Sequence, residues 1–345
     1  MQSEAIALSK HGGPEVLERI SLEIPEPGPR EVRVRVHCVA MNHMDLWVRK
    51  GGPAFKLQYP HRLGCDIAGV VDALGPGARG AAVGERVMLQ PGLSCGTCKA
   101  CLSGRDNFCR SYKILGENAQ GGYVRHINVP DINLIKIGDD LSFSDAAALP
   151  LCTLTAFQMA VRKAAVKPGQ TVVVHAAGSG VSSMLIPLCK LLGAQVIATT
   201  TDAQKVERAK ALGADHVVLT SEQDYVAEIR KLTAKAGPDA IFDHVGGELM
   251  EKAVSAVAWG GKIVTCGATG GFVAKIDLRQ VFFRQIELLG STMGSKADLL
   301  EVMPFVLAGK LKPTVDRVLS LWDAREAHEA LEQRKVFGKI VLQVD

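Results

Sequence analysis

The sequence has no apolar run of 18 residues and no run of five or six charges of one sign. The first absence argues against a membrane-spanning helix. The second, together with a net charge of only +4, argues against a nucleic-acid-binding protein. The N-terminal segment also lacks the basic and apolar regions of a secretion signal, so we expect a soluble, cytoplasmic protein.

The chain does contain enough apolar sequence for two hydrophobic cores. Its 345 residues are 47% hydrophobic and 22% charged, which is typical of a globular protein with two domains. Residues 1–150 are predicted to form a β-rich domain, because short strand-like runs are separated by Gly and Pro. In one of these runs the alternation sets Val32, Val34 and Val36 on one face.

From about residue 170 the pattern changes to strands that alternate with helices. The expected strands are the short runs 171–177, 195–200, 216–219, 239–245, 262–268 and 287–293. Largely apolar strands of this kind indicate a parallel sheet covered on both faces, and six of them fit a doubly wound nucleotide-binding fold. A closing strand at 338–344 comes too late for this sheet, so we expect it to return to the first domain.

Four cysteines are predicted to bind one structural zinc ion in a lobe at about 91–113. Cys95, Cys98, Cys101 and Cys109 are separated by two, two and seven residues, and four thiolates can surround Zn²⁺ with no position left open. Without an export signal, such a cluster more often binds metal than forms disulfides. The alternatives are four free cysteines or an iron–sulfur cluster.

The segment after the first of the six strands is predicted to bind a dinucleotide. The segment reads as a strand, a turn of small residues and the first turn of a helix. In this arrangement the free backbone N–H groups of the turn and of the helix N-terminus point toward a pyrophosphate. The glycine positions of the usual G-x-G-x-x-G pattern hold Ala177, Ser179 and Ser182, and the alternative is a tight turn without a ligand. The predicted cofactor contacts in this loop are Ala177, Gly178, Ser179, Gly180 and Val181.

The tip of the second strand distinguishes NAD from NADP, because an acid there binds the ribose 2′-hydroxyl and repels a 2′-phosphate. Thr200 and Thr201 occupy this tip, and Lys205 follows one turn into the next helix. Hydroxyls and a lysine favour a phosphate, so NADP(H) is predicted over NAD(H). Asp202 argues the other way, but we interpret it as a helix N-cap. Lys205 could also be a plain surface residue.

Four further segments, 42–51, 63–78, 114–130 and 146–157, match motifs of one known enzyme family, and they occur in the same order as in that family. Over nearly its whole length the chain resembles the medium-chain dehydrogenase/reductase superfamily, and its cysteine lobe is similar to that of the zinc-type alcohol dehydrogenases. The resemblance implies an α/β protein with a GroES-like catalytic domain at 1–150, a Rossmann domain at 151–294 and a C-terminal return at 295–345. It also implies a homodimer or homotetramer, and an apolar sixth strand at the sheet edge agrees with this.

The sequence departs from the zinc-type members at all three positions that hold their catalytic zinc. These positions are Asn42, Cys65 and Leu151, with Asp66 in place of the usual Glu and Cys152 one place from the third position. The pattern is similar to that of the quinone oxidoreductase branch. It implies hydride transfer without catalytic zinc to a quinone or an activated double bond, because electron-poor acceptors need less polarisation.

The remaining site residues are also predicted from this resemblance, although Asn42 could instead be a plain turn residue. The predicted catalytic residues are Asn42, Cys65, Asp66 and Thr155, and the further cofactor residues are His43, Gly267 and Lys339, with His43 and Lys339 near the pyrophosphate. Two other functions stay open. One is an alcohol dehydrogenase with an atypical catalytic zinc on Cys65, Asp66 and Cys152. The other is a protein that keeps nucleotide binding without turnover.

Overall fold

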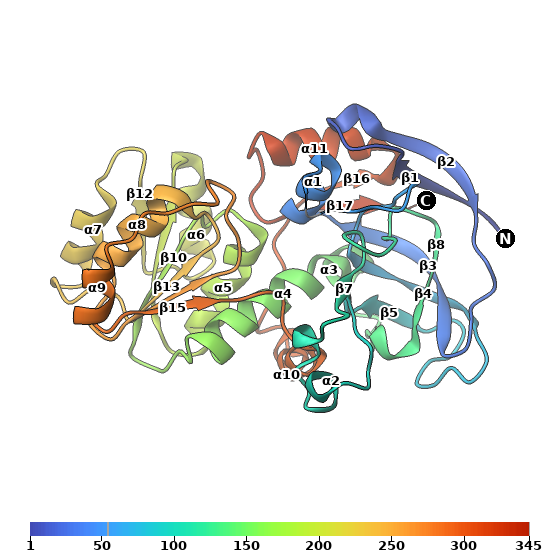
Figure 1. Ribbon diagram of the computed structural model, residues 1–345, viewed down its shortest axis with the longest axis horizontal. Helices are drawn as coiled ribbons and strands as arrows, with labels where there is room; N and C mark the ends of the chain where they lie inside the picture. Colours follow the sequence, from blue (N-terminus) through green and yellow to red (C-terminus); the bar gives the residue numbers. More distant parts are fainter. Residues whose placement is uncertain (54, 345) are drawn as a thin grey trace. The chain divides into compact units, whose positions relative to one another are not determined.

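The structure is a computed structural model that describes residues 1–53 and 55–344 (Figure 1). The chain forms two compact units, unit 1 at Met1–Leu151 with Pro313–Asp345 and unit 2 at Cys152–Lys312. The chain thus leaves unit 1 once and returns to it. The α/β class, with a β-rich unit and a doubly wound unit, is confirmed.

Unit 1 is built on a seven-stranded sheet in the order β16-β17-β3-β4-β5-β9, with β8 also paired to β3. Its strands are β3 (Glu31–Ala40), β4 (Asp66–Leu74), β5 (Arg86–Leu89), β8 (His126–Pro130), β9 (Leu134–Lys136), β16 (Val315–Ser320) and β17 (Lys339–Gln343). Val32, Val34 and Val36 on β3 are buried to 2% exposure or less, as their alternation predicts. The antiparallel pairing of β17 with β3 confirms that the closing strand returns to the first domain.

Smaller elements complete unit 1. The two-stranded sheets are β1 (Gln2–Leu8) with β2 (Leu17–Glu23), and β6 (Gly92–Leu93) with β7 (Lys113–Ile114). The helices are α1 (His43–Lys50), α2 (Lys99–Leu102), α3 (Phe143–Ala148) and α11 (Ala324–Glu332), with 3₁₀ turns at Pro14–Val16, Asp106–Phe108, Asp131–Asn133 and Leu321–Asp323. Helix α4 (Pro150–Phe157) spans the boundary between the units, and the π-helical turn Gln158–Lys163 follows it in unit 2.

Unit 2 contains a six-stranded sheet in the order β12-β11-β10-β13-β14-β15, parallel throughout. The strands are β10 (Thr171–Val174), β11 (Gln195–Thr200), β12 (His216–Leu219), β13 (Ala240–Asp243), β14 (Lys262–Thr265) and β15 (Glu287–Gly290). The helices are α5 (Gly180–Leu191), α6 (Val206–Ala211), α7 (Tyr225–Leu232), α8 (Gly247–Ala256), α9 (Leu278–Phe283) and α10 (Lys296–Leu307), with a 3₁₀ turn at Ala203–Lys205. The strand order reverses between β10 and β13, which is where such folds bind dinucleotides.

The return to unit 1 begins at Pro313, later than the expected boundary at residue 294. Helix α10 stays with unit 2, where Leu299 and Val302 are fully buried. Asp298 on this helix also forms an ion pair with Arg162 at 2.6 Å. The sequence pattern does not reveal which unit this helix packs against.

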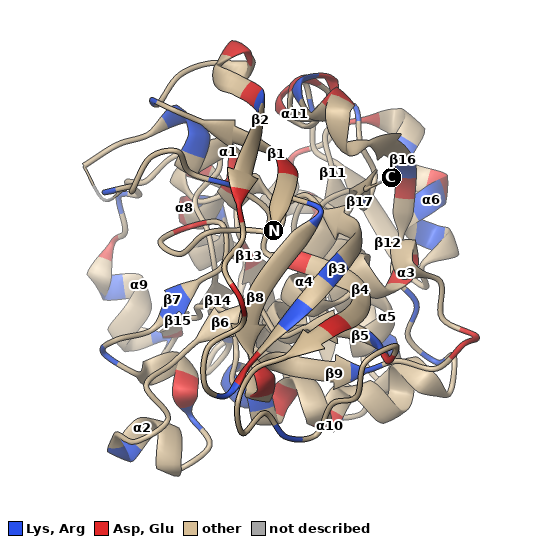
Figure 2. Cartoon of the chain, turned by 90° about the vertical axis from the view of Figure 1, so that its right-hand side faces the viewer, with Lys and Arg blue, Asp and Glu red and all other residues tan. Residues whose placement is uncertain are grey.

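Charged side chains of both signs are scattered along the chain (Figure 2). Several form local pairs, such as Arg33 with Asp72 at 2.6 Å and with Glu26 at 3.1 Å. Within the described residues, no helix is long and apolar enough to cross a membrane.

Candidate functional site

The sheet of unit 1 brings residues from three distant segments to one edge. Ala40 at the end of β3 is paired with Asp66 at the start of β4 and with Val341 near the start of β17. The backbone N–H of Met41 also donates to the carbonyl of Ile340 at 2.9 Å. This register places Asn42, Asp66 and Lys339 at the same end of three neighbouring strands.

The side chains of Asn42, Cys65, Asp66 and Lys339 form what we call the polar cluster. The Lys339 ammonium donates to Asn42 Oδ1 at 2.6 Å and to Asp66 Oδ2 at 2.9 Å. Asn42 Nδ2 donates to Asp66 Oδ2 at 2.9 Å and to Cys65 Sγ at 3.3 Å. The side chains of Lys339 and Asp66 are only 3% and 0% exposed, so this is a buried ion pair.

The backbone around the polar cluster fixes its orientation. The backbone N–H of Leu151 donates to Asp66 Oδ1 at 2.8 Å. Asn42 is the N-cap residue of α1, and its own N–H donates to Asp45 Oδ2 at 2.7 Å. Asp45 also accepts from the N–H of Gly64 at 2.9 Å, and burial raises the pKa of this carboxyl to about 6. The carboxyl of Asp45 therefore holds the start of α1, while the Asn42 side chain points into the cluster.

Three of the four predicted catalytic residues thus lie together, and Lys339 joins them. Its placement between Asn42 and Asp66 was not foreseen, and a contact with the pyrophosphate stays a prediction. His43 is the half-buried first residue of α1 in unit 1. Thr155, the fourth predicted catalytic residue, is buried on α4 and belongs to unit 2.

The predicted dinucleotide loop follows β10 and leads directly into α5. Ser179 is the N-cap residue of α5, where its hydroxyl accepts from the N–H of Ser182 at 3.1 Å. The hydroxyls of Ser179 and Ser182 both contact His244 Nε2 at 2.9 Å. Burial lowers the pKa of His244, which favours the neutral imidazole. His244, which directly follows β13, therefore fixes the side chains of Ser179 and Ser182, the two serines at glycine positions of the pattern.

The other residues of the predicted loop lie in the turn between β10 and α5 or at the start of α5, and their contact with a dinucleotide stays a prediction. Ala177 is fully buried beneath the turn, and the preceding Ala176 has a φ of 48°. Gly178, Ser179, Gly180 and Val181 are half-buried at the start of α5. Gly267 lies just after β14, where its carbonyl accepts from the Thr265 hydroxyl at 3.2 Å. These residues are at the carboxyl ends of the strands, where open parallel sheets bind nucleotides.

The tip of β11 carries a hydroxyl rather than a carboxylate. Thr200 is buried to 6% exposure, and Thr201 is exposed beside it. Asp202 Oδ1 accepts from the N–H of Gln204 at 2.9 Å, so this carboxylate is a helix N-cap, as its position suggested. Lys205 Nζ lies 3.9 Å from Asp202 Oδ2, which places a cation within one turn of the strand tip.

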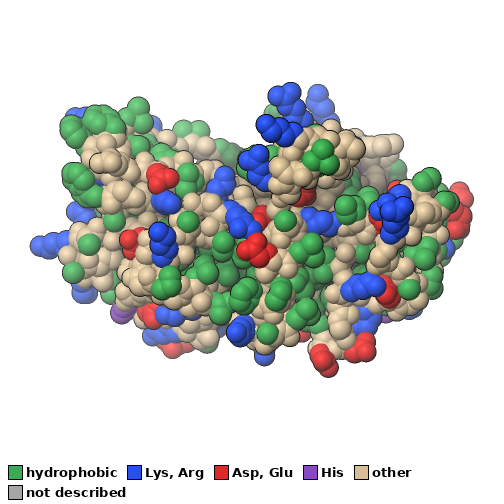
Figure 3. Space-filling model, turned by 90° about the horizontal axis from the view of Figure 1, so that it is seen from below, with side chains coloured by type: hydrophobic (Ala, Val, Ile, Leu, Met, Phe, Trp, Pro, Cys, Tyr) green, Lys and Arg blue, Asp and Glu red, His purple; other side chains and the backbone are tan. Residues whose placement is uncertain are grey.

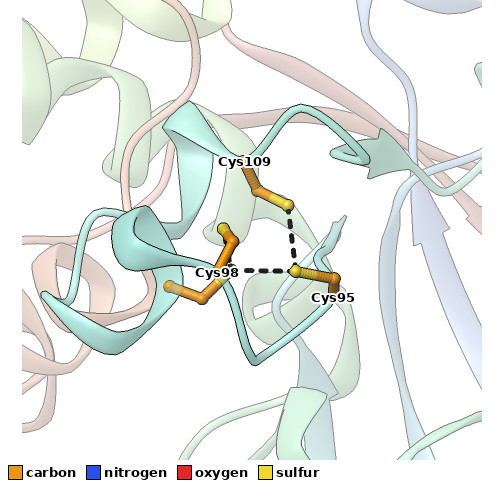
Figure 4. A group of neighbouring side chains, drawn as sticks. Cys95, Cys98 and Cys109 are labelled. Atoms are coloured by element: carbon orange, nitrogen blue, oxygen red, sulfur yellow. Dashed lines mark hydrogen bonds between the residues drawn. The ribbon is translucent and has the colours of Figure 1, made fainter.

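The four cysteines of the lobe converge, and Figure 4 labels three of them, Cys95, Cys98 and Cys109. Their ligand atoms all lie within 4.8 Å of one another. The sulfur–sulfur distances are 3.6 Å for Cys95–Cys109, 3.9 Å for Cys95–Cys101 and 3.5 Å for Cys98–Cys101. A tetrahedron of Zn–S bonds of about 2.3 Å has edges of ~3.8 Å, so the four thiols fit the ion.

The loop between the first two cysteines favours thiolate formation. Gly96 has a φ of 72° and turns the chain between Cys95 and Cys98. Backbone N–H groups of Thr97 and Cys98 lower the pKa of the Cys95 thiol to about 6. Within the described residues, the lobe is the one group of three or more His, Cys, Asp or Glu ligands close enough to hold a metal ion.

Comparison with known proteins places the chain in a family. Residues 28–139 match the alcohol dehydrogenase GroES-like domain, and residues 180–308 match the zinc-binding dehydrogenase domain. A NAD-dependent alcohol dehydrogenase of Sulfolobus acidocaldarius is 32% identical over 99% of both chains. A 2-haloacrylate reductase of a Burkholderia species is 29% identical over 98% of both chains.

The solved structures agree with the sequence relatives. A crystal structure of a NAD-dependent alcohol dehydrogenase superposes with a TM-score of 0.96 at 50% identity, and the match covers 99% of this chain and 100% of the other. The match extends over both units, and the alcohol dehydrogenase and the 2-haloacrylate reductase align with 99% and 98% of this chain. The chain therefore belongs to the medium-chain dehydrogenase/reductase superfamily and is an oxidoreductase.

Proposed function

We propose that the protein reduces an electron-poor acceptor, a quinone or an activated double bond, with NADPH and without a catalytic metal. The observation that carries this proposal is the Lys339 ammonium, which lies 2.6 Å from Asn42 Oδ1 and 2.9 Å from Asp66 Oδ2. The resemblance to the zinc-type alcohol dehydrogenases implies that Asn42 and Cys65 occupy two positions that hold catalytic zinc in that branch. A lysine cation therefore supplies the positive charge beside the residues that replace the zinc ligands.

The donor set of the polar cluster does not fit a catalytic zinc ion. Zinc binds thiolate, imidazole and carboxylate groups, and an amide is a poor ligand beside them. Both oxygens of Asp66 already accept hydrogen bonds, from the Leu151 N–H on one side and from Asn42 and Lys339 on the other. A dication here would also repel the Lys339 ammonium.

The chemistry of the acceptor agrees with a metal-free site. A nicotinamide, when bound, supplies the hydride, and negative charge then develops on an oxygen of the enolate or quinol. Fixed N–H donors stabilise such a charge in place of a Lewis acid. Lys339 Nζ and Asn42 Nδ2 are the two such donors of the cluster. The Lys339 ammonium also carries a proton that could be transferred to the reduced acceptor.

The relatives named as alcohol dehydrogenases favour a second candidate, the interconversion of alcohols and carbonyl compounds. A panel assay separates the two. We expect NADPH consumption with quinones, enones and acrylates, and little with simple aldehydes or ketones. Activity confined to alcohols and simple carbonyls would refute the first proposal. Cofactor binding with no turnover on any of these would favour a nucleotide-binding protein without enzymatic activity.

We propose that NADPH is preferred over NADH, although the similar alcohol dehydrogenases are named as NAD-dependent. Thr200 offers a hydroxyl at the strand tip, and the Asp202 carboxylate is engaged in capping. Lys205→Ala is expected to weaken NADPH binding about tenfold, because a charge-assisted hydrogen bond to the 2′-phosphate is lost. NADH binding should change little, and Thr200→Asp should shift the preference toward NADH. Titrations with both cofactors measure this, and equal effects of Lys205→Ala on the two would contradict it.

We propose that the cysteine lobe holds one structural zinc ion on Cys95, Cys98, Cys101 and Cys109. Four thiolates leave no position for a substrate, so the ion would stabilise the lobe between residues 91 and 113 and take no part in hydride transfer. In such small lobes the binding free energy of the metal is largely folding free energy.

We propose that two chains pair through the edge of the unit 2 sheet. Strand β15 is the edge strand, and Leu288, Phe282 and Phe283 near it are 43%, 61% and 66% exposed. Hydrophobic side chains are exposed on the face shown in Figure 3, with one group at its left end. An exposed apolar edge of this kind favours pairing with a second copy.

Light scattering should give the mass of a dimer, or of a tetramer built from dimers. The double variant Phe282→Ser/Phe283→Ser should shift the mass toward the monomer, because it removes apolar area from the interface. Leu102→Ser on α2, at a residue that is 76% exposed, is the matched control and should leave the mass unchanged. A monomeric wild-type protein would contradict the proposal.

A further inference from the structure

A hollow of about 720 Å³ in unit 2 is lined by α7, the end of α8, the segment before β14 and α9. Four of its lining residues are cations, Arg230, Lys231, Lys235 and Arg284, and none is an acid. We call this site the basic hollow. Helices α7, α8 and α9 lie together in Figure 1.

The basic hollow is separate from the predicted cofactor loop. Its residues Ser255, Val257 and Trp259 precede β14, and Arg284 precedes β15, so they lie at the amino ends of parallel strands. The dinucleotide loop follows β10 at the carboxyl end of the same sheet. The basic hollow and the dinucleotide loop therefore lie at opposite ends of the strands of this sheet.

Three of the four cations of the hollow have no acidic partner among the described residues. Within the described residues, no carboxylate lies within 4.0 Å of the side-chain nitrogens of Arg230, Lys235 or Arg284; Lys231 alone of the four is paired, with Glu228 at 3.2 Å. Burial and the neighbouring charge of Arg230 lower the pKa of the Arg284 guanidinium. An anion in the hollow would relieve this repulsion.

The two guanidinium groups are held in place by the last turn of α8. Arg284 Nη1 donates to the carbonyl of Val254 at 2.8 Å, and Arg230 Nη2 donates to the carbonyl of Ser255 at 3.3 Å. Fixed in this way, they lose little conformational entropy when they bind an oxyanion. Capping α8 explains these two arginines, but it does not explain Lys235 or the neighbouring Trp259, which is 72% exposed.

We propose that the basic hollow binds the phosphates of a nucleoside diphosphate or triphosphate, with the base stacked on Trp259. Guanidinium groups match phosphate oxygens in pairs, and lysines add charge at the rim. Stacking of a base on an exposed aromatic ring adds affinity whatever the base. The size of the hollow, about 720 Å³, falls within the range of small-molecule sites. This proposal is independent of the reaction that the protein catalyses.

Calorimetric titration of the full-length protein, first loaded with one equivalent of NADPH per chain to fill the tighter cofactor site, tests the proposal. ADP and inorganic pyrophosphate are the two probes, and we expect both to bind. Lys231→Gln with Lys235→Asn should weaken both about tenfold, because two phosphate contacts are lost. Asn is chosen because residue 235 has a φ of 71°, which Asn tolerates. Trp259→Ala should weaken ADP several-fold and leave pyrophosphate unchanged.

Lys210→Gln is the matched control. Lys210 pairs with Glu207 on α6 with the same spacing as Lys231 with Glu228 on α7, but it does not line the hollow. It should not change binding, and none of these variants should change NADPH turnover. The proposal is wrong if the wild-type protein loaded with one equivalent of NADPH binds neither probe, or if the double variant binds both as tightly as the control. Equal loss of both probes in Trp259→Ala would overturn the stacking of the base.

Discussion

Lys339→Met should reduce kcat with an electron-poor acceptor about 100-fold or more, because a fixed donor for the developing oxygen charge is lost. The same change should also destabilise the protein by about 3–5 kcal/mol, because it leaves the buried Asp66 carboxylate without its cation. Stopped-flow reduction kinetics and denaturant unfolding measure the two effects separately.

A second substitution distinguishes the chemical role of Lys339 from a structural one. In the double variant Lys339→Met/Asp66→Asn the uncompensated charge is gone, so most of the stability should return while kcat stays low. Lys190→Met is the control, since Lys190 forms a half-exposed ion pair with Asp215 at 2.8 Å. It should cost less than about 1 kcal/mol and leave kcat unchanged. Recovery of both stability and rate in the double variant would show that Lys339 only balances Asp66.

Cys98→Ser should remove the zinc ion and unfold the lobe at 91–113. A serine hydroxyl is a weak replacement for a thiolate, and the three remaining thiols would be left as a crowded, partly ionised group. Dinucleotide binding by unit 2 should largely survive, because its loop after β10 belongs to the other unit. Zinc analysis, limited proteolysis of the lobe and cofactor titration report the three expectations.

Cys65→Ser is the matched control for the cysteine change. Cys65 is a buried thiol of unit 1 in the polar cluster, outside the four-cysteine group. This variant should keep one zinc ion per chain and most of the turnover. Absence of metal from fresh, reduced wild-type protein would contradict the zinc assignment altogether.

The sequence predicted the elements of the fold well, because their signals are local. Each of the six strands of unit 2 is a short apolar run, and the structure has a strand within each predicted range. The spacing of the four cysteines likewise predicts the position of the lobe, since all four ligand positions lie within one short segment. The boundary at Pro313 was harder to predict, because nothing local in α10 indicates which unit will bury Leu299 and Val302.

Contacts between distant segments were the main part that the sequence did not predict. Asp66 and Lys339 are 273 positions apart, and they come together because β3 is paired with β4 on one side and with β17 on the other. His244 meets Ser179 and Ser182 in the same way, because β13 lies beside β10 in a sheet whose order is not the chain order. A polar residue directly after a parallel strand was the available signal for His244, and a lysine at the start of the returning strand was the signal for Lys339.

The most direct test of a metal-free active site is the zinc content of protein whose turnover of an enone or quinone is measured in the same preparation. We expect one zinc ion per chain, full activity at that content, and no gain when zinc is added or when a mild chelator removes loosely bound metal. Two zinc ions per chain, with activity rising in proportion to the second and lost in Cys65→Ser, would contradict the account. Lys339 would then be a neighbour of a catalytic metal rather than its replacement.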